Sequence, residues 1–126
     1  MFKNALLVFL GGGIGSLLRY YAQSLVDGCW QNVGFPLGTF VVNFIGSLLI
    51  GIALGMLGNN QQHYIRFLFV IGFCGGFTTF SAFTNDSLLL INRGAYGLAA
   101  LYAVGSVAVC IGMTGIGYFA TKMIKK

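Results

Sequence analysis

Charge is the scarcest property of this sequence: charged residues make up only 7% of its 126 positions, against about 25% in soluble domains. Only two of them, Asp27 and Asp86, are acidic. A chain with so little charge cannot cover a surface that faces water, and 57% of its residues are hydrophobic. We therefore predict an all-α integral membrane protein in which residues 1–126 form a single domain.

Residue patterns for catalysis and metal binding are also missing. The one histidine, His63, lies in a polar link with no carboxylate beside it. The cysteines show neither CxxC nor Cys/His spacing; they are Cys29, Cys74 and Cys110. A G-x-S-x-G elbow, a P-loop and a basic patch with interleaved aromatics are absent. The sequence therefore argues against an enzyme and against a nucleic-acid partner.

Long apolar runs take the place of charge. Four of them reach the roughly 20 residues needed to cross a bilayer, and we predict spans over residues 5–26, 37–57, 65–91 and 95–121. The first run resembles a secretory signal, but it continues to Tyr21 without an A-x-A cleavage site, so we predict that it is retained. An even number of spans places both termini on the same side of the membrane.

Basic residues are distributed unevenly between the two sides. Those on the side of the termini are Lys3, Arg66, Lys122, Lys125 and Lys126. Arg19 and Arg93 lie toward the other side. The positive-inside rule places the termini in the cytoplasm, although the modest bias also allows insertion in both orientations.

Glycine is abundant, with 20 residues, and several glycines are spaced four apart, as in Gly11/Gly15 and Gly72/Gly76. Such faces let helix backbones approach closely in lipid. Because four helices enclose little interior, we predict from this packing potential that the chain forms a homo-oligomer.

The stretch 72–86 combines an apolar run with several polar side chains. Gly75 and Gly76 allow the backbone to leave the helix near the middle of the third span, and Phe80 and Phe83 share a helical face. Hydroxyl groups accompany them at Thr78, Thr79, Ser81 and Thr84. Irregular backbone at membrane depth is tolerated only when it is buried in protein or lines a polar cavity. The stretch predicts either an ion pathway at a broken helix or a helix-packing face with a kink.

Further polar side chains lie inside the other predicted spans. Asn43 has an amide with two donors, which either lines a pathway or forms an interhelical hydrogen bond. Tyr102, Ser106 and Cys110 follow one another at intervals of one turn, where they either line a pathway or hold helices together. Arg19 is costly in lipid unless it is paired or reaches the interface, and we assign it a structural role.

The ligand that such groups favour is a small anion. No carboxylate lies in the middle of a span, whereas amide, hydroxyl and backbone N–H groups are donors. Aromatic rings add electropositive edges. These groups are neutral and weak, so they can replace the hydration of an ion without trapping it, as conduction requires.

Three segments resemble the signatures of the Fluc/CrcB fluoride channels: GGGIGSLLRY at 11–20, GTFVVNFIGS at 38–47 and GGFTTFSAF at 75–83. The resemblance extends over essentially the whole chain. It implies a fluoride-selective channel that exports fluoride passively across the bacterial inner membrane. It also implies an antiparallel, dual-topology homodimer with two pores.

The resemblance assigns roles to individual residues. It implies that Phe80 and Phe83 contact fluoride through their ring edges and that Asn43 is oriented toward the pathway. The polar-track positions of the family correspond to Ser81, Tyr102 and Ser106. Backbone carbonyls at Gly75 and Thr78 would hold a structural Na+ at the dimer centre. The chain departs from the family pattern at Ala82, Cys110 and Asp86, where Thr, Ser and Glu are common.

Two other functions are compatible with a chain of this size. A small multidrug-resistance-type transporter also has four spans, but it needs a carboxylate in the middle of its first span to exchange protons. The first span here carries Arg19 and no mid-span acid. A non-conducting assembly protein would use the small-residue faces alone.

Overall fold

The computed structural model describes residues 1–60 and 63–126, and every regular element in this part of the chain is a helix. The elements are α1 (Phe2–Cys29), α2 (Leu37–Leu57), the π-helix η1 (Arg66–Cys74), α3 (Gly75–Phe77), α4 (Phe80–Asn92) and α5 (Tyr96–Ile124). Together they form four helical stretches long and apolar enough to cross a membrane, the third being Arg66–Asn92. The prediction of an all-α, four-span membrane protein is confirmed.

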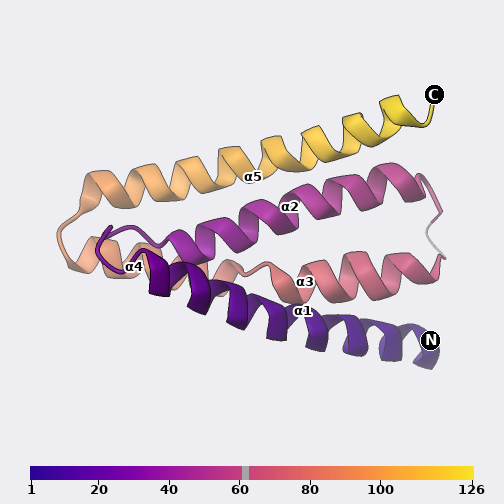
Figure 1. The fold of residues 1–126 in the computed structure, drawn as a ribbon, viewed down its shortest axis with the longest axis horizontal. Helices are drawn as coiled ribbons and strands as arrows, with labels where there is room; N and C mark the ends of the chain where they lie inside the picture. The colour runs from indigo at the N-terminus through magenta and orange to yellow at the C-terminus, as the bar shows by residue number, and fades with distance from the viewer. Residues whose placement is uncertain (61–62) are drawn as a thin grey trace.

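The helices form an elongated bundle with both termini at the same end (Figure 1). α2 packs mainly against α5, and α1 packs mainly against η1 and α3. Consequently the first part of the third stretch, η1 and α3, lies between α1 and α2. Its last part, α4, packs against α5. This arrangement gives the third stretch two faces with different neighbours.

Glycines allow these helix pairs to touch through their backbones. A Cβ atom added at Gly11 would lie closer than 3.0 Å to the Leu68 carbonyl oxygen, and one added at Gly51 would meet the Thr114 carbonyl oxygen in the same way. Glycine faces therefore serve contacts within one chain, α1 against η1 and α2 against α5. This is the close approach of helix backbones that the glycine spacing predicted, and the homo-oligomer stays a prediction.

The third stretch changes conformation between α3 and α4. Thr78 has φ −79° and ψ 156°, and Thr79 has φ −147° and ψ 115°, so both residues are extended. Gly75, by contrast, is helical, with φ −62° and ψ −36°. The helical conformation thus ends after Phe77 rather than at the glycine pair. The helical Gly76 has another purpose, because an added Cβ there would lie closer than 3.0 Å to the Gly12 carbonyl oxygen.

Candidate functional site

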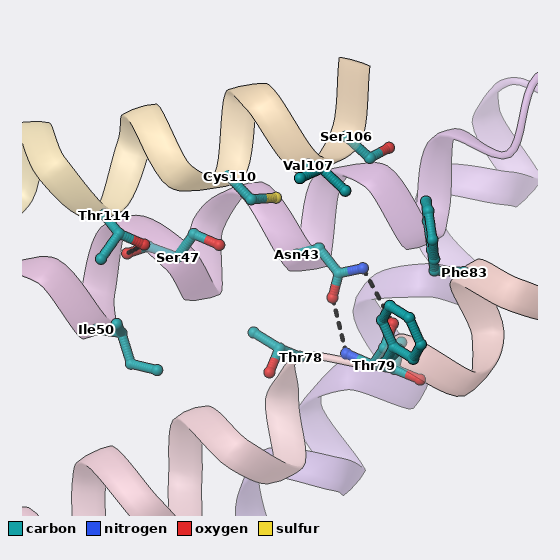
Figure 2. A pocket seen from close by; sticks show the side chains of 11 residues that line it. Asn43, Ser47, Ile50, Thr78, Thr79, Phe83, Ser106, Val107, Cys110 and Thr114 are labelled. Carbon is teal, nitrogen blue, oxygen red and sulfur yellow. Dashed lines mark hydrogen bonds between the residues drawn. The ribbon is translucent and has the colours of Figure 1, made fainter. Parts of the chain in front are cut away.

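A cavity of about 270 Å³ lies between α2, α5 and the extended Thr78–Thr79 segment. Figure 2 shows its lining, with Asn43 and Ser47 projecting from α2, and Ser106, Cys110 and Thr114 projecting from α5. None of the described residues that line it is charged. No residue of α1 is among the described lining residues, so the cavity lies on the side of the third stretch that faces away from α1.

Asn43 holds the extended segment in place. Its Nδ2 donates to the Thr79 carbonyl oxygen at 3.1 Å, and its Oδ1 accepts from the Thr79 N–H at 2.7 Å. An extended residue directs its N–H and C=O to the same side, so one amide can pair with both, as the dashed lines in Figure 2 show. Thr79 is only 8% exposed, and buried backbone polar groups need hydrogen-bond partners. The Asn43 amide supplies both.

The same contacts define the role of Asn43 in this structure. The sequence left open whether its amide lines a pathway or forms an interhelical hydrogen bond. Asn43 does line the cavity, but both polar atoms of its amide bind the backbone of Thr79. Asn43 therefore fixes the shape of the opposite wall, and one of its two amide N–H donors has no partner among the described residues.

Thr79 also starts α4. Its Oγ1 accepts from the Ala82 N–H at 3.2 Å, as an N-cap residue does. The Ser81 hydroxyl lies 3.2 Å from the same oxygen. Ser81 is exposed and is not among the residues that line the cavity. The structure therefore places Ser81 beside the helix cap rather than in the cavity.

Two carbonyl oxygens lose their helical donors as a result. The Thr79 N–H would bind the Gly75 oxygen in a continuous helix, and the Ala82 N–H would bind the Thr78 oxygen. Both donors are directed elsewhere, to Asn43 and to the Thr79 side chain. Among the described residues, no hydrogen bond reaches the Gly75 or Thr78 oxygen. A Cβ added at Gly75 would meet nothing within 4 Å, so this side is open.

Aromatic rings border one end of the cavity. The ring centroids of Phe80 and Phe83 are 5.4 Å apart, and those of Phe83 and Tyr102 are 5.2 Å apart. Phe80 is 74% exposed although it lines the cavity. Tyr102 is buried behind Phe83 and does not itself line the cavity. The structure thus brings the two predicted phenylalanines together at the cavity and leaves Tyr102 behind them.

The polar stripe of α5 follows the cavity for three turns beyond Tyr102. Ser106 is 5% exposed, and its Oγ has no hydrogen-bond partner in the described chain. Cys110 comes one turn later and Thr114 another turn later. The sequence interpretation stopped at Cys110 and missed Thr114, which the same four-residue spacing would have identified. The Thr114 hydroxyl donates to the Ser47 carbonyl oxygen at 3.1 Å.

Asp86 ends a hydrogen-bonded chain beyond the aromatic rings. Its Oδ2 accepts from the Thr39 hydroxyl at 2.6 Å and from the Tyr102 hydroxyl at 3.4 Å. Gln23 Nε2 in turn donates to Thr39 Oγ1 at 3.2 Å. Gln23 and Thr39 were not singled out from the sequence, because their contact partners are distant in the chain. The carboxylate does not line this cavity; it lines a separate one of about 320 Å³, together with Asp27 and Arg93.

Arg19 lies on the opposite face of the third stretch. Its Nε donates to the Gly76 carbonyl oxygen at 3.0 Å, and the Ser16 hydroxyl donates to the same oxygen at 3.4 Å. These bonds join α1 to α3 and do not reach the cavity. In the described ranges, no group of three or more His, Cys, Asp or Glu side chains could hold a metal ion. Backbone carbonyls are the remaining candidates for a cation.

Residues 6–118 match the family model described as CrcB-like protein, Camphor Resistance (CrcB). The chain belongs to the CrcB-like family. This match covers all three segments on which the resemblance was based.

Named relatives of this CrcB-like chain are ion channels rather than enzymes. The "Fluoride-specific ion channel FluC" of Rhodopseudomonas palustris is 48% identical over 109 residues, which cover 84% of this chain and 86% of the relative. The protein of the same name from Novosphingobium aromaticivorans is 47% identical over 111 residues, with 86% of each chain covered. The one from Phocaeicola vulgatus is 42% identical over 121 residues, with 90% and 93% covered. This CrcB-like protein is accordingly a multi-pass membrane protein.

Proposed function

We propose that this protein is a fluoride channel of the bacterial inner membrane, which exports fluoride passively down its electrochemical gradient. The relatives are named for fluoride-specific conduction. The observation in the chain itself that carries the proposal is the cavity, because its described lining is uncharged and contains a buried hydroxyl, Ser106, without a partner. An anion is the ligand that would accept from such a donor.

The lining offers weak contacts to a small anion along its length. The Ser106 hydroxyl is buried and has no partner among the described residues, and the rings of Phe80 and Phe83 can present electropositive edges nearby. Thr114 uses its hydroxyl on a backbone carbonyl and so shapes the wall, whereas Asn43 uses only one of its two amide N–H donors in this way. With no fixed charge among the described lining residues, the anion is not held tightly and can leave again. Phe80, Phe83, Ser106 and the second amide N–H of Asn43 are therefore the proposed fluoride contacts.

A structural Na+ fits the freed carbonyls of the third stretch. The oxygens of Gly75 and Thr78 accept no hydrogen bond in the described chain, and hard oxygen ligands suit a hard cation. Gly75 is exposed and has open space around it, which leaves room for ligands from another chain. When bound, the ion would supply a positive potential that favours an anion nearby. Gly75 and Thr78 would hold it through their backbones.

The proposed assembly is an antiparallel, dual-topology homodimer with two pores. The cavity wall that contains Phe80 is open, since that ring is 74% exposed. A second copy against this side would cover Phe80 and bring its own Gly75 and Thr78 to the same region. If the two copies have opposite orientations, a two-fold axis in the membrane plane relates them and brings the same residues of both copies to this region.

Efflux from liposomes that contain the purified protein tests the proposal. Fluoride release that is passive and exceeds chloride release supports the channel. Efflux of a cationic drug driven by a proton gradient would instead indicate the multidrug-type transporter. Such a transporter needs a carboxylate for proton exchange, and the described cavity lining contains none. Absence of any flux from a correctly folded protein would indicate a non-conducting assembly protein.

A further inference from the structure

The end of the bundle that contains both termini carries the whole net charge of the chain. Its basic residues, called the basic end below, are Lys3, Arg66, Lys122, Lys125 and Lys126. The other two basic residues, Arg19 and Arg93, are matched in number by the two acidic ones, so the net charge of +5 comes from the basic end. Both acidic side chains line the second cavity, at the opposite end of the bundle, where α1 ends (Figure 1). No carboxylate side chain therefore neutralises the basic end.

Tyrosine rings fix the position of two of these lysines. The Nζ of Lys3 lies 4.7 Å from the centroid of the Tyr64 ring, and the Nζ of Lys122 lies 4.5 Å from that of the Tyr118 ring. A cation above an aromatic face is attracted to the ring, and tyrosine is enriched where lipid headgroups meet water. Both ammonium groups are thus placed at the depth at which lipid phosphates lie.

Exposed apolar side chains continue from these lysines toward the middle of the membrane. Leu6 and Phe9 follow Lys3 along α1, and both are exposed. Phe119, which precedes Lys122 along α5, is exposed as well. Inorganic phosphate would use only the charges, whereas a phospholipid also places its acyl chains on this apolar surface. The combination of charge and apolar surface therefore favours a lipid.

Helix direction accounts for the lysines of α5 but not for Lys3 and Arg66. α2 and α5 end at the basic end, and cations are favourable at helix C-termini. Lys122 lies in the last turn of α5, and Lys125 Nζ donates to the Met56 carbonyl oxygen near the end of α2. α1 and η1 begin there, with no acidic residue in the first turn of either helix. A negative charge that complements Lys3 and Arg66 must therefore come from outside the chain.

We propose that the basic end binds the headgroup of an anionic phospholipid of the phosphatidylglycerol class. The headgroup phosphate accepts hydrogen bonds from the ammonium and guanidinium groups, and the acyl chains pack against the exposed apolar side chains that follow. Each basic residue close to an anionic lipid surface strengthens binding by about fivefold. The binding is a property of the folded protein, so it depends neither on fluoride conduction nor on the orientation of insertion.

Native mass spectrometry of the purified protein measures this binding. The protein is equilibrated in micelles with equal amounts of phosphatidylglycerol and phosphatidylcholine of the same acyl chains, and the lipids retained per chain are counted. We expect the wild type to retain at least tenfold more phosphatidylglycerol, and Arg66→Gln to lower this preference by about fivefold. Arg93→Gln is the matched control, because it removes the same charge beside the second cavity and should keep the wild-type preference. Equal retention of both lipids by the wild type, or an equal loss in the two arginine variants, overturns the proposal.

Two further measurements on the wild type need no substitution. Raising the salt from about 0.1 M to about 1 M shortens the Debye length from about 10 Å to about 3 Å, so the preference for phosphatidylglycerol should fall. A preference that is the same in both salt concentrations contradicts a site based on charge. Inorganic phosphate in tenfold excess over the lipid should leave phosphatidylglycerol bound. Displacement by inorganic phosphate would identify a soluble anion as the occupant and overturn the lipid site.

Discussion

The two faces of the third stretch differ in how closely they are packed. Toward α1 the backbones are in direct contact: an added Cβ at Gly15 would lie closer than 3.0 Å to the Phe73 carbonyl oxygen. Toward α2 and α5 the same stretch borders a cavity of about 270 Å³. One element thus combines a tightly packed face with a hollow one.

The difference follows from the residues that meet on each side. On the α1 side, glycines remove the side chains that would hold the backbones apart, and Arg19 adds a bond to the Gly76 oxygen. On the other side, Asn43 bridges to Thr79 and keeps α2 at side-chain distance from the extended segment. The packed face anchors the stretch, and the amide bridge preserves the space. Substitutions on either face should therefore have separable effects.

The largest effect is expected on the packed face. Gly15→Ala would place a methyl group against the Phe73 carbonyl oxygen, and backbone atoms cannot move aside as a flexible side chain can. Overpacking of this kind costs about 1–3 kcal/mol, so we expect a large fall in the melting temperature of the detergent-solubilised protein. Gly13→Ala is the matched control, because a Cβ there meets nothing within 4 Å. Equal melting temperatures of the two variants would contradict the packing described here.

The next largest effect is expected at the amide bridge. Asn43→Asp keeps an acceptor for the Thr79 N–H but sets a carboxylate oxygen against the Thr79 carbonyl oxygen. An unsatisfied buried polar group costs about 1–3 kcal/mol, and the new negative charge lies beside the proposed anion route. We expect loss of most fluoride flux together with reduced stability. Asn59→Asp, the same change in an exposed residue near the end of α2, should leave both unchanged.

A smaller effect, confined to conduction, is expected for Phe80→Ile. The ring is 74% exposed in the single chain, so its removal should affect folding little. Aromatic contacts are worth about 1 kcal/mol, which predicts a reduction in fluoride efflux of about fivefold. Phe119→Ile, a change on α5 at a residue that is 64% exposed, provides the control. Unaltered efflux from folded Phe80→Ile would remove this ring from the pathway.

The smallest effect on stability is expected for the unpartnered hydroxyl. Ser106→Ala removes a group that makes no bond within the described chain, whereas Thr114→Val removes the bond to the Ser47 oxygen. A typical hydrogen bond contributes about 0.5–1.5 kcal/mol. Thermal unfolding should therefore show a loss for Thr114→Val and little change for Ser106→Ala, with fluoride efflux reduced mainly in Ser106→Ala. The reverse pattern would show that Ser106 has a partner in the folded protein.

Part of this site could be predicted from residue spacing, and part could not. The four-residue interval on α5 identifies Ser106 and Cys110, and it also contains Thr114, which the interpretation did not include. The family resemblance placed Ser81 in the polar track, and in the structure its hydroxyl lies beside the N-cap of α4, outside the cavity lining. Spacing gives the face of a helix. It does not show which element that face meets.

The position of the extended segment illustrates the same limit. The sequence attributed the change in backbone conformation to Gly75 and Gly76, the residues with the greatest conformational freedom. In the structure the extended residues are Thr78 and Thr79, and the amide that holds Thr79 comes from Asn43, 36 positions earlier. Local flexibility allows a change in direction. The partner that satisfies the freed backbone decides where it occurs.

By itself the sequence determined that this is a membrane protein with four membrane-spanning stretches. The length and hydrophobicity of a stretch depend only on residues that are neighbours in the sequence. It also supplied the segments by which the family could be recognised. Only the tertiary structure decided which face of the third stretch is packed and which borders the cavity, that Asn43 binds the Thr79 backbone, and that Ser106 has no hydrogen-bond partner among the described residues. These properties depend on pairs of residues from different helices, and the distance between such residues is set by the packing of the helices that carry them.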